Sequence, residues 1–195
     1  MAVKIIVGST CDIEENIKKD LIVVPLHVTF GEEDFLDSVD ITKDEFYERL
    51  ERKEEFPKTS QPTPVAFMDV YKKVIDEGDE AVVIVLSSKL SGTYQSAKLA
   101  SQGLEDKIFI VDSLNVSNAE GALVDYALRL VREGKSAREI AQLLEEAKKR
   151  LRLVVLVDTL EYLERGGRIS KASALIGGRT FATAAYQSAA TKMNF

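Results

Sequence analysis

The stretch AVVIVL, residues 81–86, decides the fold class. An unbroken apolar run of this length, rich in valine and isoleucine, is typical of a strand that is buried on both faces, as in a parallel sheet. The segment SSKL follows it, and a helix is predicted from near Ser91 to about Ser101. A buried strand that leads through a short loop into a helix is the unit from which α/β folds are built.

Similar apolar runs recur along the chain. Strands are predicted at VKIIV (residues 3–7), KIFIV (residues 107–111) and LRLVVLV (residues 151–157). The run LIVVPLHVTF (residues 21–30) is predicted to be one further strand, in which Pro25 marks an edge or a bend because proline has no amide hydrogen to donate. Since strands and helices alternate, we predict an α/β fold of three layers, with a mostly parallel sheet and helices on both faces.

Capping residues mark where several helices begin. Thr42 with Glu45, and Ser136 with Glu139, have the spacing of a capping box, in which each side chain bonds the other residue's backbone amide. Asp12 is expected to cap a short helix, and the acidic segment GEEDFLDSVD after the second strand is expected to be a loop. The predicted helices cover residues 13–19, 42–52, 64–77, 119–132 and 136–151.

Composition excludes several classes of function. The chain has 195 residues, 45% of them hydrophobic and 30% charged, so one globular domain with a substantial core is expected. A net charge of −6 argues against a nucleic-acid partner, because no basic stripe is available to neutralise phosphates. The first residues lack the apolar segment of a signal peptide, and no apolar run approaches the roughly 18 residues of a membrane span. Cys11 is the only cysteine, which excludes an internal disulfide and is typical of the reducing cytoplasm.

The segment LSSKLSGTYQSA, residues 86–97, places small polar side chains directly after the central strand. Ligands of open α/β sheets bind beyond the carboxyl ends of the strands. A helix that begins near Ser91 would direct the amides of Gly92 and Thr93 toward that place, which suits a carboxylate or a phosphate. An equally simple interpretation is that Ser91 only caps the helix.

A second polar segment, PKTSQPTPVAF (residues 57–67), carries Thr59, Ser60, Gln61 and Thr63. Thr63 is explained as the N-cap of a helix whose first turn holds the following proline. The other three side chains are not explained by capping. Hydroxyl groups can hold an anion without a full opposing charge, which keeps binding reversible.

Most catalytic signatures are missing. The chain has no GxxxxGK[ST] phosphate loop, no GxGxxG fingerprint and no G-x-S-x-G elbow. Its only histidine, His27, falls within a strand pattern, and no cluster of Cys and His indicates a metal site. Cys11 has no nearby base and is predicted to be a small buried residue. The simplest interpretation of YLERGGRIS, residues 162–170, is a helix end followed by a turn.

Four segments together resemble the signature of the DegV family: KTSQPT, LSSKLSGTYQSA, IFIVDS and LEYLERGGRISK. The resemblance covers the chain from Val3 to about Gly177 and implies a bacterial protein whose N-terminal α/β domain binds a long-chain fatty acid, with an apolar tail of about C16–C18 to bury. In that family the first Thr of TSQP and the Ser of LSGT bond the carboxylate, and these are Thr59 and Ser91 here. The two polar loops would therefore form one headgroup site. Supporting contacts are expected from Ser9, Ser60, Gly92 and Thr93.

The resemblance also bears on partners. Some DegV proteins present the bound acid to a kinase, which implies a lipid carrier or a substrate-presenting subunit for a fatty acid kinase, with no catalytic residue, metal or cofactor of its own. Apolar side chains near Phe67 and Leu163 are expected to line the acyl tail. Two alternatives stay open: an enzyme, for instance a phosphotransferase or hydrolase with Ser91 or Ser9 as nucleophile, and a truncated domain without a ligand. The missing base, metal and phosphate loop favour the carrier.

The chain departs from the family pattern at two places. Gly8 stands where the family usually has Asp, at the carboxyl end of the first strand. The family also continues into a second domain that contributes polar contacts to the ligand, whereas RTFATAAYQSAATKMNF does not resemble that continuation. We therefore predict a DegV-like domain over residues 1–178 and a divergent tail over residues 179–195. The chain is expected to self-associate, or to cover its exposed apolar face with this tail.

Overall fold

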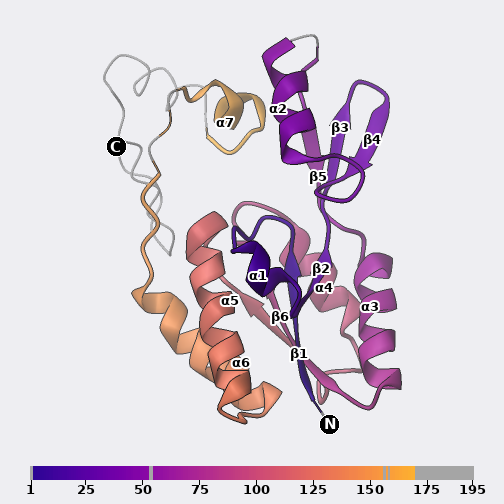
Figure 1. Cartoon of the computed structure of the whole chain (residues 1–195), viewed down its shortest axis with the longest axis vertical. Coiled ribbons are helices and arrows are strands. Elements are labelled where there is room, and N and C mark those ends of the chain that lie inside the picture. Colours follow the sequence, from indigo (N-terminus) through magenta and orange to yellow (C-terminus); the bar gives the residue numbers. More distant parts are fainter. Residues whose placement is uncertain (1, 53–54, 156, 158, 170–195) are drawn as a thin grey trace.

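The computed structural model describes residues 2–52, 55–155, 157 and 159–169 (Figure 1). Within these ranges the chain forms two sheets, the larger of which is covered by helices. The elements in chain order are β1 (Val3–Gly8), α1 (Glu15–Lys18), β2 (Leu21–Val24), β3 (His27–Phe30), β4 (Glu33–Leu36), α2 (Lys43–Arg52), β5 (Lys58–Ser60), α3 (Pro64–Asp76), β6 (Glu80–Val85), α4 (Thr93–Ala100), β7 (Ile108–Asp112), α5 (Ser117–Arg132), α6 (Ala137–Ala147), the 3₁₀ turn η1 (Lys148–Arg150) and α7 (Glu161–Arg165).

The larger sheet is parallel and has the strand order β2-β1-β6-β7. Ile5 of β1 lies opposite Val82 of β6, and Ile84 of β6 lies opposite Val111 of β7. The chain first adds β2 on one side of β1 and later adds β6 and β7 on the other, so the order reverses between β1 and β6. This arrangement confirms the predicted parallel sheet. It also makes the carboxyl ends of β1 and β6 the place where a ligand is expected.

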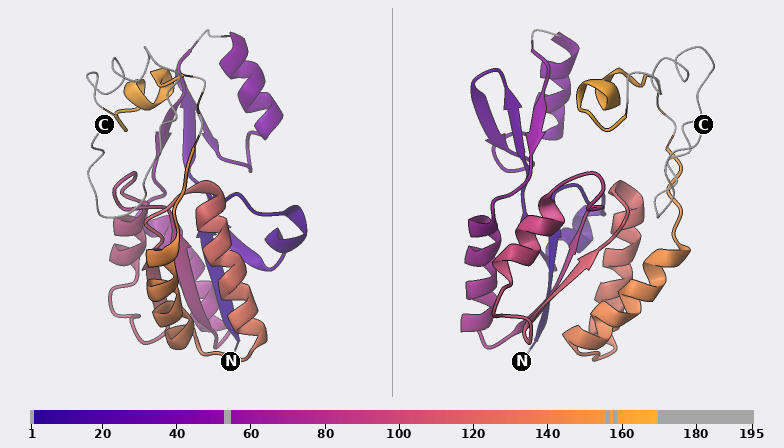
Figure 2. Two further views of the ribbon diagram at one scale, coloured as in Figure 1. Left: turned by 90° about the vertical axis from the view of Figure 1, so that its left-hand side faces the viewer. Right: turned by 180° about the vertical axis from the view of Figure 1, so that it is seen from behind.

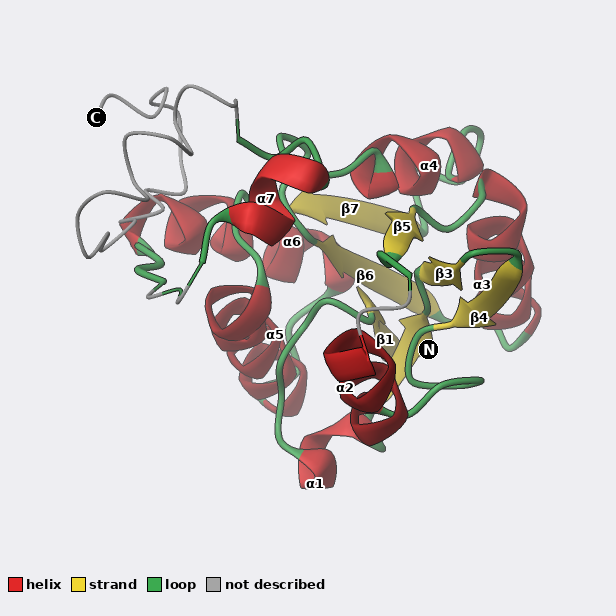
Figure 3. Cartoon of the chain, turned by 90° about the horizontal axis from the view of Figure 1, so that it is seen from above, coloured by secondary structure: helices red, strands yellow, loops and turns green. Residues whose placement is uncertain are grey.

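Helices cover both faces of this sheet: α5 and α6 lie on one face, and α3 and α4 lie on the other (Figures 1 and 3). Side chains alternate along the central strands, so Ile5 and Val82 pack toward α5 and α6, and Ile6 and Val83 pack toward α3 and α4. Each of these four residues is at most 1% exposed. A strand with no solvent face is apolar at every position, which is why AVVIVL is unbroken. The predicted three layers are confirmed.

A second, antiparallel sheet with the order β4-β3-β5 was not predicted. Residues 21–30 do not form one strand: β2 belongs to the parallel sheet and β3 to the antiparallel one, and Pro25 lies where the chain passes between them. Figure 2 shows this small sheet and α2 beyond the end of the parallel sheet. Val28, Phe30 and Ile41 form its own small core, against which Phe35 packs.

The acidic segment 31–40 is not simply a loop, as the sequence suggested, because Glu33–Leu36 forms β4. Gly31 turns the chain with a φ of 56°, which glycine adopts without steric cost, and this allows β3 and β4 to pair as a hairpin. Val28 lies opposite Phe35 in that hairpin. The apolar partner across the strands, rather than local composition, therefore decides the structure here.

Two further predictions need correction. The short helix α1 begins at Glu15 with Glu14 as its N-cap, so Asp12 does not cap it. Residues 151–155 and 157, predicted to be part of a strand, pair with no strand among the described residues. The Lys148 ammonium group bonds the backbone oxygen of Asp112 at 2.8 Å, and beyond η1 the chain runs away from the sheet toward α7.

The capping predictions for Thr42, Thr63 and Ser136 are confirmed. The Glu45 amide donates to Thr42 Oγ1 at 3.2 Å while the Thr42 amide donates to Glu45 Oε2 at 2.8 Å. The pair Ser136 and Glu139 forms the same reciprocal box at α6. Thr63 accepts from the amide of Ala66 and so caps α3. The predicted tail over residues 179–195 lies outside the described residues and stays a prediction.

Candidate ligand-binding site

Two polar loops lie at the carboxyl edge of the parallel sheet, and Figure 3 looks onto this edge. Ser9 and Thr10 follow β1, and the segment from Ser87 to Ser91 follows β6. Because β1 and β6 are paired neighbours, the loops after them begin side by side. The fold therefore places Ser9, an expected supporting residue, beside the loop after β6 that the sequence singled out.

Ser91 lies at the start of α4, and the N-cap position itself is taken by Gly92. The Ser91 and Thr93 hydroxyl oxygens are 2.9 Å apart, and the Thr93 amide donates to Ser91 Oγ at 3.3 Å. Thr93 is fully buried, whereas Ser91 is half-buried. The capping interpretation of Ser91 is therefore partly right, because its oxygen accepts from the first helical amide although it is not the N-cap.

Thr59 lies in strand β5, not in a loop as predicted, and pairs with Val28 of β3. Both Thr59 and Ser60 are exposed. Within the described part of the chain, neither hydroxyl makes a side-chain hydrogen bond. The extended backbone of β5 thus presents two hydroxyl groups with bonding capacity to spare.

Gln61 joins the two polar segments. Its Nε2 donates to Ser96 Oγ of α4 at 2.9 Å, and its Oε1 lies so close to Gly92 that any side chain at position 92 would collide with it. A side chain at position 92 would therefore displace the Gln61 amide group. This contact places the end of β5 beside the start of α4. The resemblance implied this proximity, because it assigned the TSQP and LSGT motifs to one site. Whether Thr59 and Ser91 hold one ligand stays a prediction.

The fourth signature segment, of which residues 160–169 are described, contacts the chain just before β5. Tyr162 of α7 stacks on Phe56 with ring centroids 5.5 Å apart and an angle of 15° between the rings. The Arg165 guanidinium lies 5.2 Å from the centre of the Phe56 ring. Phe56 lies two residues before the start of β5, so α7 supports the segment that carries Thr59. The helix ends at Gly166, and Gly167 has a φ of 74°, which confirms the predicted helix end and turn.

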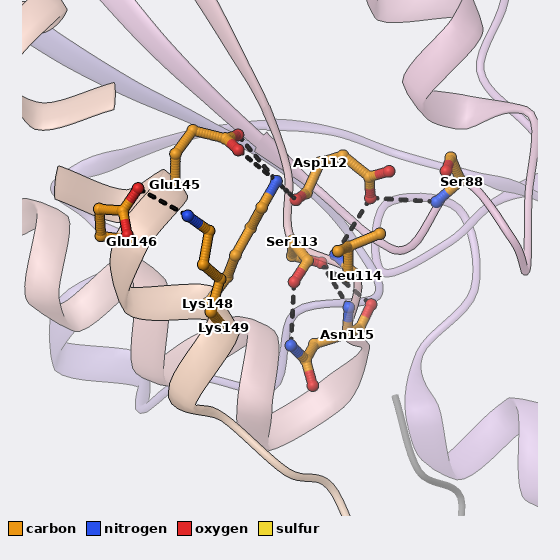
Figure 4. A network of polar contacts seen from close by, with 9 residues as sticks. All are labelled: Ser88, Asp112, Ser113, Leu114, Asn115, Glu145, Glu146, Lys148 and Lys149. Carbon is orange, nitrogen blue, oxygen red and sulfur yellow. Dashed lines mark hydrogen bonds and ion pairs between the residues drawn. The ribbon is translucent and has the colours of Figure 1, made fainter. Parts of the chain in front are cut away.

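A network around Asp112 fastens the β6 loop, and the sequence did not predict it (Figure 4). Asp112 Oδ1 accepts from the amides of Ser88 at 3.1 Å and Leu114 at 3.0 Å. Lys148, only 8% exposed, bonds the backbone oxygen of Asp112 and pairs with Glu145 at 2.7 Å. One carboxylate thus joins the loops after β6 and β7. The Asp at the end of IFIVD was an available sequence signal, but the burial of a lysine 36 residues further on was not predictable from the sequence.

Glu120 is a second site residue that the sequence reasoning missed. Its side chain is fully buried in the first turn of α5, where Oε2 accepts from Thr10 Oγ1 at 3.1 Å and Oε1 has no partner. Burial, with a smaller contribution from the Asp12 carboxylate, raises the pKa of Glu120 to about 8. The signal was its spacing: Glu120 precedes the buried Leu123 and Val124 by three and four residues, on the inward face of the helix.

Ser9, Cys11 and Gly8 also lie at or near the carboxyl end of β1. Ser9 Oγ accepts from the amide of Leu26 at 3.1 Å. Cys11 is buried, as predicted, and burial together with the nearby Glu120 and Asp12 carboxyl groups raises the pKa of its thiol. Gly8 leaves a space whose nearest side-chain atom is Thr10 Oγ1, 3.6 Å from the position of a Cβ.

His27 lies on β3, opposite Leu36 of β4 and Ser60 of β5. Its Nδ1 is 2.7 Å from Asp34 Oδ2 on the neighbouring strand, and this contact lowers the pKa of Asp34. No three His, Cys, Asp or Glu side chains of the described ranges gather so that they could hold a metal ion. None of the helices described is long and apolar enough to cross a membrane.

These features define a class: a parallel α/β domain with polar loops at the switch point of its sheet. The family model for the uncharacterised DegV proteins matches residues 2–180, and the chain belongs to the DegV family. It is 40% identical over 176 residues to a DegV domain-containing protein of Clostridium perfringens, a match that covers 89% of this chain and 63% of the relative. The chain therefore spans a little under two thirds of the length of this relative.

Solved structures have the same fold. A DegV family protein from Thermus thermophilus, described by its fatty acid binding, matches with a TM-score of 0.81 and 36% identity, over 91% of this chain and 64% of that one. DegV of Bacillus subtilis, described as a fatty acid binding protein, matches with a TM-score of 0.80 and 34% identity over the same shares. A stearic acid-binding protein from Eubacterium ventriosum matches with a TM-score of 0.76 and 31% identity, again over 91% and 64%.

Removal of the Asp112 carboxylate is expected to destabilise the fold. Asp112→Ala leaves the Ser88 and Leu114 amides without their acceptor and should lower the free energy of unfolding by about 2 kcal/mol. Asp112→Asn keeps an acceptor oxygen at that place and should lower the free energy of unfolding by less than about 1 kcal/mol. Urea unfolding of both variants measures the difference. If Asn proves as costly as Ala, the two amide bonds are not what makes Asp112 stabilising.

The raised pKa of Glu120 predicts how stability depends on pH. The folded value of about 8 lies above the ordinary value of 4.5, so the folded state binds the extra proton between these values. Stability is then greatest below the ordinary pKa, falls as the pH rises toward about 8 and changes little beyond it, with a total on the order of a few kcal/mol. In Glu120→Gln this decline should disappear, and in Glu133→Gln, a surface change on the same helix, it should persist. Thermal unfolding at a series of pH values provides the test; a decline of equal size in both variants contradicts the assignment.

Proposed function

We propose that this chain binds a long-chain fatty acid, with the carboxylate held between Thr59 of β5 and Ser91 at the start of α4. The observation that carries the proposal is the contact of Gln61 with Ser96 and Gly92, which sets these two hydroxyl-bearing segments side by side. The descriptions of the Thermus, Bacillus and Eubacterium proteins as fatty acid or stearic acid binding support the choice of ligand.

The chemistry of the site suits a carboxylate. Thr59 and Ser60 have free hydroxyl hydrogens, and the start of α4 adds the partial positive charge of a helix N-terminus. Hydrogen bonds to an ionised acceptor are stronger than those between neutral groups, yet they lack the attraction of a full opposing charge. Such a site binds an anion reversibly, as a carrier must. In this proposal Ser9, Gly92 and Thr93 support the headgroup through the loop backbone.

The acyl tail requires an apolar wall. Phe67, expected near the tail, is fully buried between α3 and the sheet, where its ring centroid is 5.9 Å from that of Tyr71, so it offers no open wall. Leu163 of α7 is half-buried, and the stacking of Tyr162 on Phe56 brings α7 beside the Thr59 strand. The proposal therefore places the start of the tail along α7.

We further propose that the protein carries or presents the acid and does not transform it. The hydrogen bonds of Ser91 are to Thr93 and that of Ser9 is to the Leu26 amide, so no described side chain is placed as a general base for either serine. The exposure of Thr59 leaves the carboxylate end open to a second protein, which supports presentation to a kinase. The single cysteine supports a cytoplasmic setting.

The direct test is removal of both hydroxyl groups. The double variant Thr59→Ala and Ser91→Ala should bind palmitate on the order of 10²-fold more weakly, because it loses two hydrogen bonds to a charged acceptor. Thr29→Ala is the matched control, since Thr29 lies on the same small sheet but its hydroxyl bonds Asp34 at 3.0 Å. Isothermal titration gives the affinities and circular dichroism checks the fold. A folded double variant that binds palmitate as well as the parent would refute this site.

Chain length should govern competition. Each methylene group that is buried contributes about 0.8 kcal/mol, so palmitate should displace a fluorescent fatty acid far better than octanoate does, and acetate should hardly compete. Displacement titrations with the three acids measure this series. Equal competition by acetate and palmitate would mean that only the carboxylate is recognised and that the ligand is not a long-chain acid.

A further inference from the structure

The buried carboxyl group of Glu120 has no role in the proposed headgroup contacts, although it lies behind one of the two loops. Its Oε2 accepts from Thr10 Oγ1, and its Oε1 is enclosed without a partner. A buried polar atom without a partner is costly, so its retention at the edge of a ligand site calls for a physical explanation.

Several contacts hold the first turn of α5 against the loop after β1, and the hydrogen bond between Glu120 and Thr10 is one of them. The Ser117 amide donates to the backbone oxygen of Thr10 at 3.1 Å, and Ser117 Oγ donates to Asp12 Oδ2 at 2.6 Å. Gly121 lies so close to the backbone oxygen of Asp12 that a side chain there would collide with it. Residues 9–12, which we call the β1 loop, are thus pressed against α5, and Glu120 is the one fully buried titratable group in this contact.

The charged surroundings favour a proton on Glu120. The charge that acts on it is that of the Asp12 carboxylate. Asp12 itself forms an exposed ion pair with Lys43, whose Nζ is 3.4 Å from Asp12 Oδ1. Cys11, the other titratable group at this place, is buried and neutral. Since no described cation pairs with Glu120, ionisation would leave a buried charge beside a second carboxylate.

Resting on the function proposed above, we propose that Glu120 is a positioning residue of the headgroup site. Its neutral carboxyl group fixes Thr10 and the β1 loop at the carboxyl edge of the sheet. When the proton is lost to water, the ionised group draws solvent in, the contact between α5 and the β1 loop loosens, and the site binds a fatty acid more weakly. The loosening of the β1 loop affects the headgroup site through Ser9. This residue precedes Thr10, and its hydroxyl oxygen accepts a hydrogen bond from the Leu26 amide.

The pH profile of binding tests this role, because a purely structural role would not produce it. Palmitate affinity is measured at about pH 6.5 and about pH 9.5, on either side of the Glu120 transition, for the parent, Glu120→Gln, Thr10→Val and the control Glu133→Gln. The parent and the control should bind roughly tenfold more weakly at the higher pH, the factor expected for the loss of about one hydrogen bond. Glu120→Gln imitates the neutral form and should keep the affinity of the low-pH parent at both values. Thr10→Val should bind more weakly at both.

A parallel measurement on the ligand-free protein separates this inference from the proposed function. Hydrogen-exchange protection of the Ser117 amide should fall with rising pH in the parent and stay constant in Glu120→Gln. If the parent binds no palmitate at either pH, the proposed function is wrong, and the exchange data alone decide whether Glu120 holds the loop. If Glu120→Gln shows the same pH profile as the parent in binding and in exchange, the positioning role is overturned.

Discussion

The parallel pairing of β1 with β6 is the constraint from which the site follows. Val3 lies opposite Glu80 and Val7 opposite Ile84, and both strands lie in the core between helical layers. Parallel neighbours end at the same edge, so the loops that follow them must start side by side. The Gln61 contact, the Asp112 network and the buried Glu120 all attach to these two loops. A change of register between the strands would therefore separate every group of the proposed site.

The parts of the fold that could be predicted depend on local or strongly periodic signals. AVVIVL specifies a strand without a solvent face, and the side chains of Thr42 and Ser136 meet their capping partners within one helical turn. The parts that were missed depend on distant partners. Strand β4 exists in an acidic segment because Phe35 meets Val28 across a hairpin, and residues 151–155 are apolar but leave the sheet instead of joining it.

The candidate site, like the fold, has residues that could be predicted from the sequence and residues that could not. Thr59 and Ser91 came from the resemblance to DegV proteins, because spacing alone left capping as an explanation for Ser91. The structure adds what no short motif encodes: Gln61 reaches across to Ser96, and Asp112 and Glu120 hold the loops from behind. The positions of these side chains depend on which strand ends become neighbours. Two sequence signals were usable: Asp112 ends the strand run IFIVD, and the periodicity around Glu120 places a carboxylate on an apolar helix face.

The central claim is that one carboxylate lies between two hydroxyl groups at this edge, and a structure of the chain with palmitate tests it most directly. Crystals grown with a molar excess of the acid should show its carboxylate within hydrogen-bond distance of both Thr59 Oγ1 and Ser91 Oγ, about 2.7–3.0 Å, with the tail leading away along α7. Palmitate bound with its carboxylate elsewhere, while both hydroxyl groups contact only water, would contradict the account.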